Sequence, residues 1–330
     1  MEIFDRLRQF DILSHFSNPQ IQQLASCTSR VKYDAGQQVL TEGEDTLDAY
    51  LVDQGHVEIR RSTPYGLYTL AKLNPGELFG EASFIDRHAR SGDALAVGDT
   101  VLMPFNPIAL GKISDQDPKF QLALYWTFWK SLSHKLRQTN ERLAQFFQMA
   151  NEPAEDLPKD VPAGSDVHVG IHDKRELFRE HKLSPMEINF LATLSKAERI
   201  ESGEVLFREG QEGDRMYVVL EGRVMISKQI AGAGEEALAF LERGDFFGEM
   251  ALIDRQPRSA DATADKDGAV VLTITREVLE GMLDIQKVSS IRLLMLLSKL
   301  VAKRLREVDD KLVGWFIFSA GSGNSLGMPG

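Results

Sequence analysis

The sequence predicts a mainly β protein with flanking helices, built as two tandem jelly-roll or β-barrel domains that each end in a long closing helix. Three observations predict this fold. The chain has 330 residues, which is enough for two domains. One long pattern of residues occurs twice along the chain. Within each copy, short β-rich runs are separated by glycine turns, which is typical of small antiparallel barrels.

The internal repeat is clearest in two blocks of sequence. Residues 36–43 match residues 203–210 at an offset of 167 positions, and both blocks begin and end with glycine. Residues 75–81 match residues 243–249 at an offset of 168 positions. So few changes of offset over this distance make chance similarity implausible. One structural unit has therefore been used twice.

The repeat also predicts how the chain divides. We predict a first domain over residues 1–150 and a second domain over residues 167–314. Between them, residues 151–166 are rich in proline and poor in apolar side chains, which is typical of an extended linker. Residues 315–330 are predicted to form a flexible tail, because glycine and serine dominate this segment from Ser319 onward.

Each domain is expected to open with a short helix and to continue as strands. Ser184 is followed by proline and, three residues on, by glutamate, which predicts a helix N-terminus with a capping box. Ser17 begins a weaker version of the same pattern. Residues 216–226 and 49–59 each hold two β-rich segments around a glycine, as expected for strands.

A long amphipathic helix is predicted at the end of each domain, because apolar residues recur there at spacings of three, four and seven. In the first domain these residues are Leu122, Tyr125, Trp129, Leu132, Leu136 and Leu143. In the second domain they are Ile291, Leu294, Leu297, Val301, Leu305, Val308 and Leu312. The rows extend farther than a small barrel needs, so we expect the helices to pair partly with each other. Both a monomer with an internal pseudo-dimer and a homodimer fit this pattern.

Composition narrows the classes of function. The formal net charge is −11, and an acidic chain lacks the positive field that drives nucleic-acid binding. Cys27 is the single cysteine, so no internal disulfide can form and a reducing compartment is expected. The sequence shows neither a secretion signal nor an apolar run of about 20 residues. We therefore expect a cytoplasmic protein that binds neither nucleic acid nor a membrane.

One segment of the second domain, residues 247–260, carries the chemistry of a binding site. Gly248, after Phe247, permits a close backbone approach, and a short helix that starts there would present free N–H groups to an anion. Arg258 offers a planar fork for two phosphate oxygens. Glu249 repels a phosphate, so it must face a donor such as a ribose hydroxyl. This arrangement fits a ligand that carries both a phosphate and a sugar hydroxyl.

At these residues the chain resembles the cyclic nucleotide-binding domain family, which includes the regulatory subunits of cAMP-dependent protein kinase and the bacterial catabolite activator. The phosphate-binding cassette of this family reads Phe-Gly-Glu, then Ala-Leu, then Pro-Arg-(Ala/Ser/Thr)-Ala. Residues 247–260 match each of these positions. The resemblance covers nearly the whole chain, as two tandem domains. It implies a jelly-roll fold and a cyclic nucleotide ligand.

The resemblance also implies a role for each cassette residue. Glu249 is expected to hold the ribose 2′-hydroxyl, and Arg258 is expected to hold the cyclic phosphate. Three further residues are expected to complete the phosphate cradle: Met250, Ala251 and Ala260. Ser259 occupies the position that adjusts purine preference in the family. Serine is found there in catabolite activators, so we expect cAMP as the ligand, with cGMP as the other candidate.

The first domain carries a less complete cassette over residues 79–92. Its candidate binding residues are Phe79, Gly80, Glu81, Ala82, Ser83, Arg90 and Ser91. It departs from the family at Ser83, Ala89 and Gly92, where alanine, proline and alanine are usual. Losing proline and gaining glycine loosen the turn, and ordering it costs about 0.5–1 kcal/mol more for each change. We expect this site to bind more weakly or to be only a structural copy.

A ligand-free alternative exists for both cassettes. In that arrangement the glutamate and the arginine form a salt bridge with each other at a corner of the barrel. A buried arginine beside free backbone amides is poorly stabilised without an anion, and this disfavours the alternative. The corresponding whole-protein alternative is a scaffold of two degenerate barrels that mediates contacts between proteins.

Aromatic side chains near the barrels are candidate covers for a purine. Trp126 and Trp129 follow the first barrel, and Trp315, Phe316 and Phe318 follow the second. Packing of these rings between a helix and a barrel explains the presence of the aromatic residues at least as well as a purine cover does.

No metal site and no catalytic residues are predicted. His168 and His172 are four residues apart, but Gly170 and the β-branched neighbours disfavour a helix there. No arrangement of a nucleophile with a histidine stands out, and no segment is left over for a catalytic domain. We therefore do not expect an enzyme.

Taken together, the residues and the resemblance predict a cyclic nucleotide receptor that regulates an effector protein by movement of its closing helices. The sequence does not identify the effector. A transcription factor of the catabolite-activator type is not expected, because only 18 residues follow Leu312 and they cannot form a helix-turn-helix domain.

Overall fold

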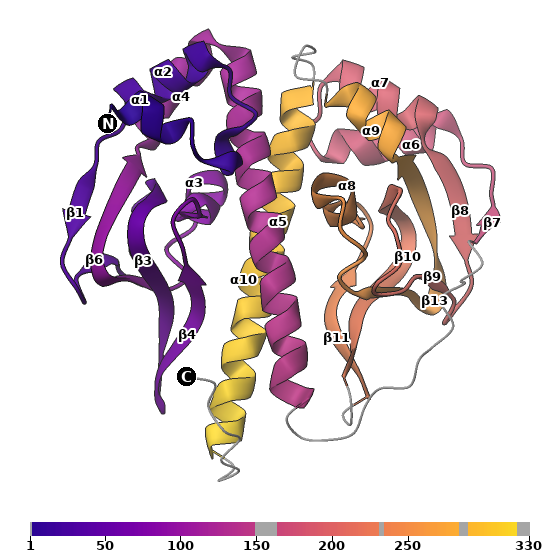
Figure 1. The fold of residues 1–330 in the computed structure, drawn as a ribbon. Helices are drawn as coiled ribbons and strands as arrows, with labels where there is room; N and C mark the ends of the chain where they lie inside the picture. Colours follow the sequence, from indigo (N-terminus) through magenta and orange to yellow (C-terminus); the bar gives the residue numbers. More distant parts are fainter. Residues whose placement is uncertain (1, 149–163, 231–233, 284–289, 322–330) are drawn as a thin grey trace. The chain divides into compact units, whose positions relative to one another are not determined.

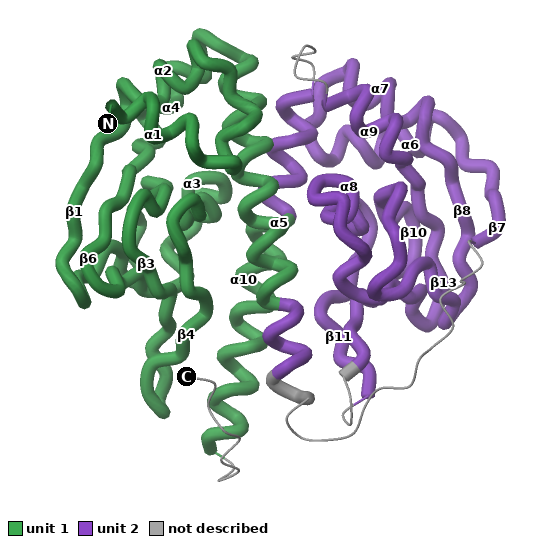
Figure 2. Tube along the Cα trace, viewed as in Figure 1, with its two compact units in different colours: residues 1–139, 301–330 green, residues 140–300 purple. Residues whose placement is uncertain are grey.

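The structure, a computed structural model, describes residues 2–148, 164–230, 234–283 and 290–321. The chain divides into two compact units, shown in different colours in Figure 2. Unit 1 comprises residues 1–139 and 301–330, and unit 2 comprises residues 140–300. Each unit holds one antiparallel sheet with helices around it (Figure 1).

Unit 1 opens with three short helical segments, α1 (Ile3–Leu7), η1 (Asp11–Leu13) and α2 (Asn18–Ser26). Ser17 and Gln20 form the capping box of α2, which confirms the predicted helix start. Asp53, which is fully buried in the sheet, pairs with Arg6 and Arg30. These two ion pairs attach the opening segment to the barrel.

The sheet of unit 1 has six strands. They are β1 (Val31–Tyr33), β2 (Gln38–Leu40), β3 (Ala49–Thr63), β4 (Gly66–Leu73), β5 (Leu78–Phe79) and β6 (Asp93–Phe105). The main order is β1-β6-β3-β4, with β2 on β6 and β5 on β3. The segment predicted to hold two β-rich runs is one long strand, β3, whose register with β6 shifts around Gly55. Gly55 has φ of 75°, which explains glycine at this bulge.

Three further helices are described in unit 1, one between β5 and β6 and two after β6. They are α3 (Glu81–Asp86), α4 (Pro107–Gln116) and α5 (Pro118–Gln148). Helix α3 directly follows β5, so the first cassette lies at a corner of the barrel. Asn106 caps α4, because its side chain accepts hydrogen bonds from the amides of Ile108 and Ala109.

Unit 2 repeats this architecture, which confirms the predicted tandem fold. Its strands are β7 (Ser165–Asp166), β8 (Lys196–Ile200), β9 (Val205–Phe207), β10 (Arg215–Ile230), β11 (Gly234–Leu241), β12 (Phe246–Phe247) and β13 (Asp261–Thr275). The main order is β11-β10-β13-β8-β7, with β12 on β10 and β9 on β13. Strands β10 and β13 thus correspond to β3 and β6 of unit 1.

The helices of unit 2 are α6 (Ile171–Glu180), α7 (Pro185–Leu194), α8 (Met250–Asp254), α9 (Arg276–Met282) and the first part of α10 (Ile291–Gly321). The capping box predicted at Ser184 is present, since Ser184 and Glu187 exchange hydrogen bonds between side chain and backbone. Helix α6 begins one residue after Gly170, so His172 is helical and His168 is not.

Both predicted closing helices are present, and each has 31 residues. Their apolar rows are mostly buried, as expected for helices that cover a core. Helix α10 begins in unit 2 and ends in unit 1. Within unit 1, Thr139 of α5 donates a hydrogen bond to Asp309 of α10, 3.3 Å away. The two helices are therefore in contact there, in line with the expected partial pairing.

One boundary differs from the prediction. The flexible tail was expected from residue 315, but α10 continues to Gly321. The reason is packing, because Phe316 lies 4.8 Å from the ring of Tyr68 in unit 1. The rest of the predicted tail, residues 322–330, lies outside the described residues.

The predicted linker, residues 151–166, lies mostly outside the described residues too. At its end, Ser165 and Asp166 form β7, which pairs with β8. The domain boundaries proposed from the repeat stay a prediction. No helix within the described ranges combines the length and the apolar character that crossing a bilayer requires.

Candidate functional site

The second cassette is a tight corner between strand β12 and helix α8. Gly248 follows the last residue of β12 and has φ of 74°, in the left-handed region that favours glycine. A Cβ atom at Gly248 would lie 2.7 Å from Nη1 of Arg258. Glycine is therefore needed here both for the turn and for the close approach of the arginine.

Arg258 is buried against the backbone of this corner, with 5% of its surface exposed. Its Nη1 atom donates to the carbonyl oxygen of Gly248 at 2.6 Å, and its Nη2 atom donates to that of Arg215 at 2.7 Å. The guanidinium also lies over the ring of Phe207, 4.2 Å from the centroid. Burial lowers the pKa of Arg258, and the negative charges of Asp214 and Glu249 oppose that shift.

The Nε atom of Arg258 is buried and has no hydrogen-bond acceptor among the described residues. In the described part of the chain, no carboxylate lies within 4.0 Å of this guanidinium either. Glu249 is only 2% exposed, yet it does not form the salt bridge with Arg258 that the ligand-free alternative requires. A buried cation with an unused donor is costly, so this corner is suited to receive an anion.

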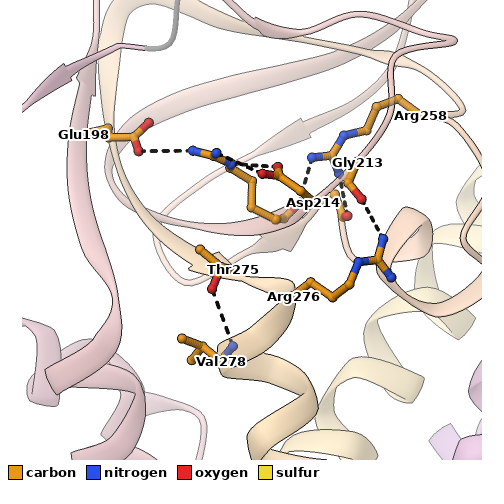
Figure 3. A network of polar contacts seen from close by, with 9 residues as sticks. Glu198, Gly213, Asp214, Arg258, Thr275, Arg276 and Val278 are labelled. Atoms are coloured by element: carbon orange, nitrogen blue, oxygen red, sulfur yellow. Dashed lines mark hydrogen bonds and ion pairs between the residues drawn. The ribbon is translucent and has the colours of Figure 1, made fainter.

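Two residues that the sequence interpretation missed support this corner (Figure 3). Arg276, the first residue of α9, donates to the carbonyl oxygens of Leu252, Gly213 and Ala251 at 3.0, 2.8 and 3.1 Å. It thereby joins the end of α8 to the loop before β10. Only the fold shows this role, because Arg276 lies outside the cassette and matches no motif.

Gly213 is the second residue that was missed. A Cβ atom there would lie 2.5 Å from the Cβ of Ala251 and 2.9 Å from Cζ of Arg258. Glycine at this position therefore makes room for the arginine side chain. The repeat contained a signal for this position. At the offset of 167, Gly213 stands where the first repeat has Thr46, so the two repeats differ here beside their arginines.

A chain of ion pairs holds the backbone that receives Arg258. Arg215 pairs with Asp214 at 2.8 Å and lies 4.0 Å from Glu198. The hydrogen bond from Arg215 lowers the pKa of Asp214, and the same bond raises the pKa of Arg215. The backbone carbonyl oxygen of the same Arg215 accepts a hydrogen bond from Arg258.

The other predicted residues of this cassette have simpler environments. Phe247 is a core residue, and its ring stacks on that of Tyr217 at 5.1 Å between centroids. Its side chain therefore anchors the corner to the core. Three residues are buried at the turn: Met250, Ala251 and Ala260. Ser259 is half-buried, and its hydroxyl lies 3.9 Å from the sulfur of Met250.

The first cassette has the same backbone geometry. Gly80 has φ of 78°, and Arg90, 4% exposed, donates to the carbonyl oxygens of Gly80 and Asp48 at 3.0 and 2.8 Å. One contact differs from the second cassette, because Nε of Arg90 donates to the hydroxyl of Thr46 at 3.0 Å. The salt bridge between Glu81 and Arg90 that the ligand-free alternative requires is absent from the described contacts, and Glu81 pairs with Lys135 instead.

Contacts within the first cassette account for two of its departures from the family pattern, those at Ser83 and Gly92. Phe79 belongs to the core, while Ala82 and Ser91 are half-buried. Ser83 is buried, and its hydroxyl accepts a hydrogen bond from Arg306 at 3.1 Å. A Cβ atom at Gly92 would lie 2.7 Å from the carbonyl oxygen of Arg60. Packing, rather than a looser turn, therefore accounts for glycine at position 92.

The aromatic candidates for a purine cover all belong to unit 1, and Phe318 among them is exposed. Trp129 is fully buried, and Trp126 lies edge-on to it and to His15. Trp315 lies 5.8 Å from Phe318, and the ring of Phe316 packs on Tyr68. Within the described ranges, no group of three or more histidine, cysteine, aspartate or glutamate side chains could hold a metal ion.

Comparison with known proteins agrees with this geometry. Residues 30–117 and 197–286, together more than half of the chain, each match the family described as cyclic nucleotide-binding domain. A cGMP-dependent protein kinase of Caenorhabditis briggsae is 25% identical over 279 residues, which are 83% of this chain and 30% of that protein. A cAMP-dependent protein kinase regulatory subunit of Yarrowia lipolytica is 26% identical over 256 residues, 76% of this chain and 53% of that protein. The chain thus spans about a third to a half of the length of these relatives.

Among solved structures, the regulatory domain of Toxoplasma gondii PKA with cAMP is similar to 88% of this chain. The match covers 92% of that structure at 18% sequence identity, with a TM-score of 0.32.

Proposed function

Because the chain belongs to the cyclic nucleotide-binding domain family, we propose that it is a cyclic nucleotide receptor whose second cassette binds cAMP. Arg258 receives the cyclic phosphate, and Glu249 receives the ribose 2′-hydroxyl. Arg276 and Gly213 position the corner around them. The receptor acts as a regulator of an effector protein and catalyses no reaction itself.

The observation that carries this proposal is the state of the Arg258 side chain. Its hydrogen bonds to Gly248 and Arg215 use two of the five N–H donors of the guanidinium. The buried Nε donor is unused among the described residues. A bound phosphate would supply both the missing acceptor and the opposite charge, and it would do so in a desolvated place where such contacts are strong.

The route from the cassette to the closing helix runs through short elements of unit 2. Arg276 connects α8 to α9, and Glu187 of α7 accepts a hydrogen bond from the amide of Leu293 in α10 at 2.9 Å. A ligand that favours one arrangement of these helices shifts their equilibrium by its difference in affinity for the two arrangements. We propose that the effector reads this shift in the closing helices.

Calorimetric titration of the full chain with cAMP and cGMP tests the proposal. Arg258→Ala should weaken binding by roughly 2–5 kcal/mol, because it removes one partner of a desolvated charge pair. Arg223→Ala is the matched control, since Arg223 is half-exposed on β10 and pairs with Asp265. Unchanged affinity of the Arg258→Ala chain would remove this residue from the site. Absence of any cyclic nucleotide binding would favour the ligand-free scaffold.

The choice of purine rests on Ser259. We propose that serine at this position favours cAMP over cGMP, by the resemblance to catabolite activators. Ser259→Thr should then shift the ratio of the two affinities toward cGMP. A competition titration measures this ratio, and an unchanged ratio would contradict the role given to Ser259.

Cytoplasmic location and the oligomeric state belong to the same proposal. The receptor is proposed to act either as a monomer with paired closing helices or as a homodimer. Chromatography with light scattering, in the presence and absence of cAMP, distinguishes the two. Specific binding of a DNA duplex in a gel shift would contradict the regulatory role proposed here.

A further inference from the structure

In the first cassette, side chains of the protein already donate to Glu81, the residue that would receive a ribose hydroxyl. Glu81 is 1% exposed, and Ser131 of α5 donates to its Oε1 atom at 2.7 Å. Lys135 of α5 donates to the same oxygen and forms an ion pair with it. Ser131 and Lys135 are one helical turn apart, so one face of α5 supplies both donors. All of these residues belong to unit 1.

The arginine of the first cassette is occupied as well. The Nε atom of Arg90 donates to the hydroxyl of Thr46, while the corresponding atom of Arg258 has no acceptor among the described residues. The repeat explains the difference, because Thr46 stands where the second repeat has Gly213. The first corner thus contains a hydroxyl acceptor at the position where, in the second corner, the Nε donor of Arg258 has no acceptor among the described residues.

A second helix fastens the first cassette from another direction. Arg306 of α10 donates to both carboxylate oxygens of Asp86 at 2.9 and 3.2 Å. It also donates to the hydroxyl of Ser83 and the carbonyl oxygen of Ala89. Its guanidinium therefore connects helix α3 with the turn that leads to Arg90. Two of its acceptors, Ser83 and Ala89, are positions at which this cassette departs from the family pattern.

From these contacts we infer that the first site is held closed by its own chain. Lys135 takes the place of the ribose hydroxyl on Glu81, and the hydroxyl of Thr46 occupies the Nε donor of Arg90. Arg306 stabilises the cassette in this closed form. The inference deepens the proposed function and rests on it, because it concerns the same kind of ligand at the second copy of the pocket.

The closed form sets the affinity of the first site. A nucleotide must replace the ion pair with Lys135 by a hydrogen bond from a neutral hydroxyl, in which only the acceptor is charged. Apparent affinity falls in proportion to the fraction of molecules in the open form. The first site should therefore fill with cAMP only at concentrations about tenfold or more above those that fill the second site.

Lys135→Met, combined with Arg258→Ala to disable the second site, tests this inference. Methionine keeps most of the length of the lysine side chain and removes its charge. Titration with cAMP should show first-site affinity about tenfold or more above that of the Arg258→Ala chain. Adding Arg90→Ala to this pair should abolish the gain, which places the new binding in the first cassette.

Matched controls separate this effect from general changes in stability. Lys112→Met removes an exposed lysine of α4 in the same unit and should leave the first-site affinity unchanged. Lys135→Gln, which keeps a neutral donor, should give a smaller gain and serves as the second variant if Lys135→Met does not fold. Thermal unfolding of each chain without ligand shows which of them are folded.

The outcomes separate this inference from the proposed function. If the wild-type chain binds cAMP through Arg258 and the Lys135 variants add nothing at the first site, the inference alone is wrong. Equal affinity of both sites in the wild-type chain also overturns it. If no variant binds a cyclic nucleotide, both proposals fail.

Discussion

At the scale of single residues, the two cassettes show how one side chain changes the state of a binding group. Arg90 and Arg258 each donate to two backbone carbonyl oxygens, which lie at equivalent positions of the two repeats. They differ at Nε, where Thr46 provides an acceptor in one repeat and Gly213 provides none in the other. The difference arises from a side chain outside the cassette, so the cassette sequence by itself does not contain it.

Gly213 yields a prediction at this scale. Gly213→Ala would bring a Cβ atom within 2.5 Å of the Cβ of Ala251 and within 2.9 Å of Cζ of Arg258, so the guanidinium must move. We expect a loss of cAMP affinity of about 1–3 kcal/mol, measured by calorimetry.

Gly281→Ala is the control for this substitution. Nothing lies within 4 Å of a Cβ atom at Gly281, which is in helix α9. This variant should bind like the wild-type chain, because alanine favours a helix and meets no obstacle. Wild-type affinity in the Gly213→Ala chain would show that the corner tolerates displacement of Arg258.

At the scale of elements, Glu187 joins two helices of unit 2. Its Oε2 atom accepts from the amide of Ser184 at 2.7 Å, which caps α7. Its Oε1 atom accepts from the amide of Leu293 at 2.9 Å, near the start of α10. The first contact was predictable from the Ser-Pro-Met-Glu pattern. The second brings together residues 106 positions apart and depends on the fold.

Glu187→Ala tests this connection. We expect the free energy of unfolding to fall by roughly 1–3 kcal/mol, because a buried carboxylate and two hydrogen bonds to backbone amides are lost. Urea denaturation followed by circular dichroism measures the change. Glu277→Ala removes an exposed glutamate of α9 and should change stability by less than about 0.5 kcal/mol. Equal stability of the two variants would mean that the contact to α10 contributes nothing.

At the scale of the whole molecule, the stability of unit 1 should depend on pH through His15. Burial, with a smaller effect of Lys130, lowers the pKa of His15 to about 4. The unfolded chain takes up this proton near pH 6.5, so it binds more protons than the folded chain between pH 6.5 and 4. Stability is therefore complete above pH 6.5 and decreases as the pH falls toward 4.

Tryptophan fluorescence reports the unfolding of unit 1 as the pH changes. All three tryptophans belong to this unit: Trp126, Trp129 and Trp315. Partial exposure of the ring screens the effect, so we expect a loss of about 1–2 kcal/mol between pH 7 and 4. His15→Gln should reduce this slope, and His134→Gln, at an exposed position, should keep it. An unchanged slope in the His15→Gln chain would contradict the assignment.

Much of the fold was open to prediction because its signals are local. Glycines at positive φ, serine caps and apolar spacing each act within a few residues, and the repeat showed them twice. The end of α10 was predicted too early, because Phe316 is held by Tyr68, a residue far away in the sequence.

The sequence by itself determined the tandem architecture and the identity of the cassettes, since both depend on short patterns of backbone conformation and on residue types at fixed spacing. Only the tertiary structure decided what surrounds the two arginines. Arg276, Gly213, Lys135 and Arg306 reach the cassettes from other elements. Their effect depends on desolvation and on distances of a few ångströms, and those quantities exist only once the chain has folded.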